Sequence, residues 1–455
     1  MTRPSQVPAA EAGLRRELGL SDLILAQVLC VVGSSWVGVA AKLGRTHVAL
    51  WVAAMLLFYL PLAVIVIYLN RLLPLEGGLY QWAKAAFGET AGFLIAWNLW
   101  VYAVIVTGAI IFVIPTDIGY MIGPSGAWLA QSTRATMAIT GLVMAGITLV
   151  AVRGLQIGKW LHNIGSSMIL LAYVILIALP LWALARGSIS HFEPIPLALP
   201  KLDIFTIAVF GQMTVGALSG FEYVAILAGE CRSAARTVGQ SVIVSAPIIA
   251  LMFILGTSSV LTFVGNQPIN LIGPIPQTFR IAFGTASWAA PFAILLVIAR
   301  AVAGASLIFT GLTRLPMTAG WDNLVPSWFT RLHPVHRTPV NSILFVAVLV
   351  MALILLSMLG VREQEANQLL AMSSAAHYAI AYIALFAIPL FGRLEISPWL
   401  KPIAAIGLLS SIVSLFVAVY PIVDVVSKAA YAAKIGAVVI LTNLIGAATY
   451  RLARR

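Results

Sequence analysis

The stretch VGSSW at residues 32–36 interrupts the first long apolar segment of the chain, and GALSG at residues 216–220 interrupts the sixth. Glycine and serine permit turns and close backbone approach, so each stretch predicts a break in a membrane helix. A break frees N–H and C=O groups, which lipid tolerates only where they line a cavity or are buried in protein. A matched pair of breaks, one in each half of the chain, indicates the substrate site of a carrier.

Composition places these breaks inside a membrane. The 455 residues are 61% hydrophobic and 9% charged, with a mean hydropathy of +1.01. A water-soluble protein could not hide so much apolar surface, and a membrane helix needs about 20 apolar residues. Such windows predict twelve helices, near residues 22–43, 47–70, 91–115, 134–152, 160–184, 204–229, 237–263, 288–314, 339–360, 366–391, 400–421 and 435–451.

The net charge of +12 indicates orientation and not a nucleic-acid partner. With the N-terminus in the cytoplasm, most of the 27 Lys and Arg fall in cytoplasmic segments, which is the positive-inside pattern. We therefore expect both termini in the cytoplasm and a multi-pass protein of a plasma membrane or a bacterial inner membrane. The cytoplasmic residues are Arg3, Arg15, Arg16, Arg71, Lys84, Arg153, Lys159, Arg232, Arg236, Arg314, Arg331, Arg337, Arg393, Lys401, Arg451, Arg454 and Arg455.

Only two cysteines are present, Cys30 and Cys231, so neither a disulfide framework nor a cysteine metal cluster is expected. We expect no metal and no cofactor. The first 20 residues are polar and lack the apolar core of a removed signal peptide, so the first span is expected to act as its own targeting signal.

Further motifs are spread along the chain. They are Leu18-Gly19-Leu20 before the first break, Pro74 to Tyr80 with Phe87-Gly88, Leu218 to Glu222 with Gly229-Glu230, and Arg314 to Asp322 followed by His333-Pro334 and Thr338-Pro339. Together these motifs resemble the amino acid–polyamine–organocation (APC) superfamily of transporters, and the resemblance covers nearly the whole chain. Residues 73–88 are too polar to cross the membrane and too apolar to be fully solvated, which predicts an interfacial helix.

The resemblance implies the LeuT-type fold. This fold is an all-α polytopic membrane protein of about twelve transmembrane helices, with a 5+5 inverted repeat, discontinuous helices 1 and 6, and two peripheral helices. The predicted parts are a cytoplasmic tail with an interfacial stretch (1–21), the first repeat (22–184), the second repeat (204–391), two further spans (400–451) and a cytoplasmic end (452–455).

The two breaks suit a zwitterion. The N-terminus of a half-helix carries roughly +0.5 of a charge and favours a carboxylate, while exposed carbonyls favour an ammonium group. The resemblance implies that Gly33, Ser34 and Ser35 contact a substrate carboxylate and that carbonyls near Val32 and Gly216 to Leu218 receive an amine. The alternative for either break alone is close helix packing by small residues. The candidate substrate-binding residues are Val32, Gly33, Ser34, Ser35, Trp36, Thr107, Gly216, Ala217, Leu218, Ser219 and Gly220.

Ionisable groups inside the membrane are candidates for ion coupling, because burying them is costly. Glu222 follows the second break, and Arg300 is predicted near mid-membrane in the eighth span. Many proton-coupled relatives in this superfamily carry a lysine in span five, where this chain has Ile169. We therefore hypothesise that Arg300 supplies a fixed positive charge instead and that it pairs with Glu222. Both have structural alternatives, a backbone-bonded glutamate and a snorkelling arginine.

Further coupling candidates carry hydroxyls or an imidazole. Ser306 and Thr310 could hold sodium with carbonyls of span one, and His377 could titrate near neutral pH, although a packed neutral histidine is the alternative. Asn98 and Tyr102 are expected to make interhelical hydrogen bonds.

The sequence therefore predicts a secondary active transporter of amino acids that works by alternating access, proton-coupled or as an exchanger. Its expected partners are a small-molecule substrate, the lipid bilayer, and H+ or Na+. The alternative within carriers is a polyamine or organic amine substrate. A channel, a non-transporting sensor and a membrane enzyme are weaker alternatives, since the Gly-x-Ser-Gly pattern at residues 123–126 is short and falls in a predicted loop. We expect no enzymatic activity.

Overall fold

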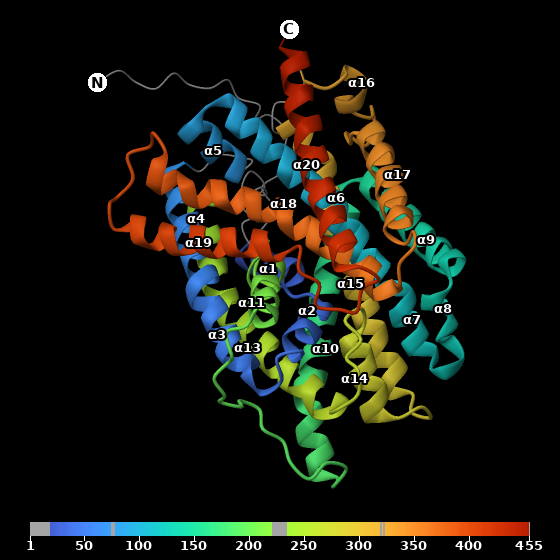
Figure 1. The fold of residues 1–455 in the computed structure, drawn as a ribbon. Helices are drawn as coiled ribbons and strands as arrows, with labels where there is room; N and C mark the ends of the chain where they lie inside the picture. The colour runs from blue at the N-terminus through green and yellow to red at the C-terminus, as the bar shows by residue number, and fades with distance from the viewer. Residues whose placement is uncertain (1–18, 74–77, 221–233, 319–320, 322–323, 455) are drawn as a thin grey trace.

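The computed structural model describes residues 19–73, 78–220, 234–318, 321 and 324–454. These residues form helices joined by loops, and no strand occurs among them. Figure 1 shows α5 and the C-terminus at one end of the molecule, with α14 and α8 toward the other. We call these the α5 end and the α14 end.

Twelve helical segments correspond to the twelve predicted spans. Between them lie the connecting helices α5 (Leu79–Phe87), α8 (Trp128–Gln131), α14 (Pro274–Phe283) and α16 (Ser327–Thr330). In chain order the spans are α1 (Leu20–Val31) with α2 (Ser34–Ala41); α3 (His47–Ala54) through η2 (Met55–Tyr59) to α4 (Leu60–Leu72); α6 (Glu89–Phe112) with α7 (Ile114–Ile122); α9 (Thr133–Arg153); α10 (Leu155–Ala185); α11 (Ile204–Gly211) with η4 (Gln212–Ala217); α13 (Ala234–Val264); α15 (Ala289–Thr318); α17 (Val340–Ser357); α18 (Glu363–Phe391); α19 (Leu400–Val417); and α20 (Lys428–Ala453).

These segments are long and apolar enough for a multi-pass membrane protein. Ten of the described helices could each cross a bilayer, and the bent pair α1 and α2 makes an eleventh span. The shorter apolar helix Ile204–Ala217 is the described part of the sixth. The predicted all-α polytopic fold is confirmed, and the helix expected between spans two and three is present as α5.

The third span is longer than the sequence windows predicted. The expected end was residue 115, but the helix continues through α7 to Ile122. Pro115 does not stop it, because a proline at the start of α7 loses no intrahelical hydrogen bond. Asp117 is consequently enclosed by helices. The sequence windows ended at residue 115 and began at residue 366, which left Asp117 and Glu365 outside the spans, but both acids are buried.

Burial separates central spans from peripheral ones. Among the ten described helices that could each cross a bilayer, the third and eighth spans are the most enclosed, with 78% and 72% of their apolar windows buried, whereas the window of α20 is only 11% buried. Spans three and eight occupy equivalent places in a five-plus-five repeat, as do the broken spans one and six. α20 packs on α6 and α18 at the edge of the bundle, which fits its expected peripheral position.

Small residues bring neighbouring spans into close contact. A Cβ atom added to Gly165 of α10 would lie 2.1 Å from the Cβ of Ala303 in α15, and one added to Gly407 of α19 would lie 2.2 Å from the Phe386 ring in α18. Lipid is as apolar as the helix surfaces, so membrane helices associate largely through such close packing and through interhelical hydrogen bonds. α15 is thereby held against α10, which positions both around the first break.

Asn98 of α6 and Asn443 of α20 provide a test of the interhelical bonds. Each amide donates to the other, at 2.8 and 3.2 Å, as the sequence predicted for Asn98. We expect a double-mutant cycle of Asn98→Ala and Asn443→Ala to give a coupling energy of about 0.6 kcal/mol, and less than about 2 kcal/mol. Unfolding of the detergent-solubilised protein measures it. The pair Asn98→Ala and Ser410→Ala lies on helices without this contact and should be additive within about 0.5 kcal/mol; equal coupling in both cycles would contradict the assignment.

Candidate functional site

The first span is broken where the sequence predicted. α1 ends at Val31 and α2 begins at Ser34, and the two helices are bent by 48°. Val32 and Gly33 between them have extended backbone, with ψ of 96° and 143°. The Val32 N–H makes the last bond of α1, to the carbonyl of Val28 at 2.9 Å, and the extended backbone after it interrupts the helix in the middle of a membrane span.

The sixth span is also irregular at the predicted place. α11 passes into the π-helix η4, which ends at Ala217, and Gly220 has φ of +106°. A side chain at position 220 would be strained, because this left-handed region favours glycine. Glu222 lies outside the described residues, so its proposed role is not tested.

The two breaks meet across one side chain, that of Trp36. A Cβ atom added to Gly33 would lie 2.7 Å from Cδ1 of the Trp36 indole, and one added to Gly216 would lie 2.7 Å from Cη2 at the opposite end of the ring. The indole therefore fills the space between the two breaks, and both flanking positions need glycine to admit it. Gly220 also approaches the first span, since its Cβ would lie 3.8 Å from the Cβ of Cys30.

Two tyrosines from unbroken spans bond to the freed backbone. The N–H of Gly220 donates to the Tyr382 hydroxyl of α18 at 3.1 Å, and the Tyr173 hydroxyl of α10 donates to the carbonyl of Gly33 at 3.4 Å. Both tyrosines are fully buried. An unsatisfied backbone group would be costly at this depth, so these hydroxyls stabilise the broken conformation.

A third partner is the buried guanidinium of Arg300 in α15. Its Nη2 donates to the carbonyl of Leu29, in the last turn of α1, at 3.0 Å. The carbonyl end of a helix carries partial negative charge, so a cation there is favourable. Arg300 is therefore beside the first break, and its Nε finds no partner in the part of the chain that the structure describes.

The N-terminus of α2 faces this region from the other side. The first four N–H groups of a helix have no partner within it, and they carry partial positive charge. In α2 these belong to residues 34–37, directly after the extended Gly33. Ser34 is buried, and the Ser35 hydroxyl donates to the carbonyl of Ile272 at 3.5 Å. An anionic group placed beside Trp36 would meet these amides.

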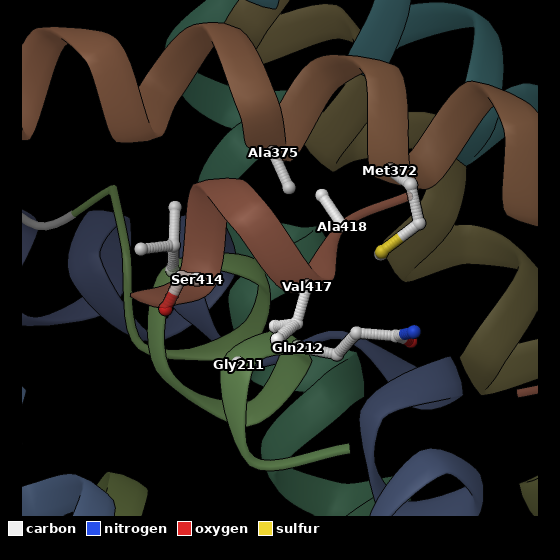
Figure 2. A pocket seen from close by; sticks show the side chains of 8 residues that line it. Gly211, Gln212, Met372, Ala375, Ser414, Val417 and Ala418 are labelled. Carbon is white, nitrogen blue, oxygen red and sulfur yellow. The ribbon is translucent and has the colours of Figure 1, made fainter. Parts of the chain in front are cut away.

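A small cavity adjoins the second break. It lies between η4, α18 and α19 and has a volume of about 10 Å³, room for about one water molecule. Figure 2 shows Gln212 at its edge, extending from η4 on the side of Met372. Both polar atoms of this buried carboxamide lack a hydrogen-bond partner among the described residues. Gln212 is one helical turn before Gly216, and its amide is free to bond a ligand or a water. The cavity is lined by Gly211, Gln212, Val215, Met372, Ala375, Ser414, Val417 and Ala418.

Other predicted residues have different surroundings. The Thr107 hydroxyl bonds to the carbonyl of Ala103 in its own helix at 2.7 Å. His377 is buried and bonded through both ring nitrogens, to the carbonyl of Ser373 and the hydroxyl of Thr442, so it links α18 to α20. This environment matches the packed histidine alternative. Val32, Ala217, Leu218 and Ser219 are buried at the breaks.

Ser306 and Thr310 do not share the face of α15 that meets the first break. Ala303 and Leu307 pack against Leu29 on that face, close to Arg300. With 3.6 residues per turn, Ser306 lies about 120° and Thr310 about 80° around the helix from Arg300. Both hydroxyls are buried and make no hydrogen bond within the described ranges. The guanidinium, and not a hydroxyl pair, approaches the α1 carbonyl.

Comparison with known proteins decides the family. The sequence pattern of the family described as "Amino acid permease" matches residues 19–443. The chain belongs to the amino acid permease family. It is therefore a membrane transporter of the APC superfamily and not an enzyme.

Individual relatives of this permease are distant. It is 24% identical over 390 residues to an uncharacterized transporter of Legionella pneumophila, covering 82% of this chain and 80% of the relative. It is 21% identical to the "Probable agmatine/putrescine antiporter AguD" of Lactococcus lactis, covering 60% of this chain and 57% of the relative. Among solved structures, MhsT in complex with L-phenylalanine superimposes with a TM-score of 0.59 at 14% identity, covering 89% of this chain and 99% of MhsT. That likeness shows the LeuT-type fold.

Three residues of the candidate site were missed by the sequence analysis. Tyr173 and Tyr382 lie within apolar spans, where an aromatic residue is usually core or interface. Gln212 comes before the second break, in a mostly apolar segment whose residues are expected to pack against other helices. The hydroxyl or amide group of each residue could have identified it, because a polar group buried inside a membrane span must find a hydrogen-bond partner.

Tyr382 offers a test of how the second break is held. We expect Tyr382→Phe to lower the free energy of unfolding by about 1–3 kcal/mol, because the buried N–H of Gly220 loses its acceptor. Denaturant unfolding in detergent measures this change, and transport should fall with it. Tyr431→Phe is the control, since the buried Tyr431 hydroxyl has no hydrogen-bond partner in the described part of the chain. Equal effects of the two substitutions would contradict the role of Tyr382.

Proposed function

We propose that this permease moves α-amino acids across the membrane by alternating access, as a proton-coupled carrier or an exchanger. The observation that carries the proposal is the meeting of the two breaks around Trp36. The N-terminus of α2 lies on one side of this space and the irregular backbone of residues 216–220 on the other. Amides suit a carboxylate and carbonyls suit an ammonium group, and an α-amino acid presents both close together.

Trp36 occupies the proposed binding position in this conformation. Its indole contacts Gly33 and Gly216, so a ligand at the breaks must displace the ring. We propose that the indole occupies the site in this conformation and that substrate replaces it. The half-buried Trp36 is then a determinant of the substrate size, and Gln212 one turn away is placed to contact the substrate side chain.

A polyamine or organic amine is the alternative substrate, and the name of the relative AguD favours it. A diamine has no carboxylate to meet the α2 amides, and its second amine would need an acid in the site. Of the acids that are buried among the described residues, Asp117 is in α7, and Glu365, at the start of α18, accepts a hydrogen bond from the N–H of Val426. Neither contacts the breaks, which favours the amino acid.

The proposal predicts a requirement for the substrate carboxylate. The purified protein, reconstituted in liposomes, should take up and exchange at least one of the common α-amino acids, identified by a thermal-shift screen that also includes polyamines. The corresponding amino acid amide, which lacks the carboxylate, should compete at least about tenfold less well, because it loses a charge-assisted interaction with the α2 amides. Uptake of diamines alone would establish the alternative.

Substitutions at the breaks give the matching structural test. Gly216→Ala should reduce uptake at least about tenfold, because its Cβ would collide with the Trp36 indole. Gly146→Ala is the control, since a Cβ there meets no atom within 4 Å. Equal uptake by the two variants would count against a site between the breaks.

We further propose that Arg300 makes transport independent of sodium. Its guanidinium bonds to the Leu29 carbonyl, so a fixed charge lies where a sodium ion would need carbonyl ligands from the first span. Uptake should be unchanged when choline replaces sodium. Arg300→Ala should reduce it at least about tenfold, because the buried carbonyl loses its donor, while the exposed Arg134→Ala should not. Sodium-dependent uptake would contradict this role.

The predicted orientation completes the proposal. If both termini are cytoplasmic, the α5 end faces the cytoplasm and the α14 end faces outside. The excess of Lys and Arg in the predicted cytoplasmic segments supports this assignment. Short loops between spans favour a bacterial inner membrane.

A further inference from the structure

Asp117 is a buried acid that the proposed transport cycle does not yet use. It lies in α7 with no exposed surface, and neither carboxylate oxygen has a hydrogen-bond partner among the described residues. An isolated ionised carboxylate is very costly to bury without partners, and such a group takes up a proton instead. We therefore infer that the carboxyl group of Asp117 is protonated and neutral in this conformation.

The segment that covers Asp117 belongs to the α14 end. We call residues 268–283, which comprise α14 and the loop before it, the lid. A Cβ atom added to Gly273 at the start of α14 would lie 2.9 Å from Oδ1 of Asp117, so the lid backbone rests on the carboxyl group. Gly273 is here a close-approach position, since a larger residue would collide with the acid.

The lid also closes over the first break. The Ser35 hydroxyl donates to the carbonyl of Ile272, and a Cβ atom added to Gly38 of α2 would lie 2.7 Å from the Cβ of Pro274. The same segment thus contacts α2 on one side and Asp117 on the other. Any movement that opens the substrate site toward the α14 end must lift the lid from both.

Hydrogen bonds hold the lid down at the end of α7. Arg280 of the lid donates to the backbone carbonyls of Tyr120 and Met121, and Asn270 donates to the Tyr120 hydroxyl at 3.2 Å. These bonds do not involve the carboxyl group of Asp117. These bonds come from an arginine, which keeps its charge, and from neutral groups, so the buried acid beneath the lid is the part that responds to protonation.

The charged and titratable groups around α7 are few. From α15, the charge of Arg300 acts on Asp117 through the core, and no ion pair joins them within the described residues. From α14, Arg280 is engaged by backbone carbonyls, and from α9, Arg134 is exposed. On α7 itself Tyr120 is bonded to Asn270, and the charge of Glu363 in α18 acts on that tyrosine. The described residues of η3, α8 and the adjoining turn of α6 contribute no ionisable side chain.

We propose that Asp117 is a proton-binding site that makes closure of the lid depend on the pH at the α14 end. With the lid raised, water reaches the carboxylate, which is ionised. A proton from that solution forms an O–H bond on the carboxylate, the neutral acid can be buried, and the lid closes. When the lid lifts, the proton returns to the same solution. The inference rests on the proposed carrier function only in that the lid covers the substrate site.

Hydrogen exchange of lid peptides in the full-length protein tests this proposal without any substrate. The rates are compared with intrinsic rates at each pH. In the wild type, the open-to-closed ratio of residues 268–283 should rise by up to about tenfold per pH unit between about pH 5 and about pH 8, because closure then requires one proton. Asp117→Asn mimics the neutral acid and should keep the low open fraction at both pH values. The exposed Asp424→Asn should behave like the wild type.

Two outcomes would overturn the proposal. One is a wild-type lid whose open fraction does not change with pH, and the other is an Asp117→Asn lid that keeps the wild-type dependence. If Asp117→Asn does not fold, the wild-type measurement still decides, together with Gly273→Ala, whose methyl group should raise the open fraction at both pH values by displacing the lid from Oδ1. Failure to transport any amino acid would sink the proposed function alone, because the exchange measurement does not depend on it.

Discussion

The backbone groups exposed at the two breaks must find partners inside the protein, and the arrangement of the site follows from that requirement. Lipid offers no hydrogen bonds, so a broken helix survives in a bilayer only where other side chains satisfy it. Here the partners are Tyr173 of α10, Tyr382 of α18 and Arg300 of α15. All three come from unbroken spans, which form a framework that holds the irregular segments in place. The same bonds must be exchanged or stretched if the broken spans move against that framework.

In the proposed site, one side chain takes the place of a ligand. The Trp36 indole lies against both glycines, and the lid lies against α2 through Pro274. A substrate can shift this arrangement only by binding another conformation more tightly. In this proposal, the contacts of the indole set the interaction energy that a substrate must exceed. The proposed size selection therefore depends on the same contacts that hold the indole between the breaks.

The two ionisable side chains Arg300 and Asp117 differ in their position in the core and in their hydrogen-bond partners. Arg300 bonds directly to the first break, whereas Asp117 lies under the lid at the α14 end and has no bond within the described chain. A permanently charged group is suited to a fixed electrostatic role, because an arginine does not release its proton. A carboxyl group can change its charge when water reaches it. We accordingly propose a fixed electrostatic role for Arg300 at the first break and a pH-dependent role for Asp117 in closing the lid.

Local sequence was enough to predict the membrane class, the twelve spans and the two breaks. Apolar windows of sufficient length are a direct consequence of bilayer thickness, and clusters such as Gly33 to Ser35 break a helix through their own backbone freedom. Tertiary structure alone decided which side chains satisfy the breaks, because Tyr173 and Tyr382 are far from them in the chain and are ordinary apolar-span residues by pattern. It also decided that Asp117 is enclosed. A window of hydropathy ends the third span at the first polar residues, whereas burial depends on α14 and α15, which arrive from more than 150 positions later in the sequence and cover that turn of α7.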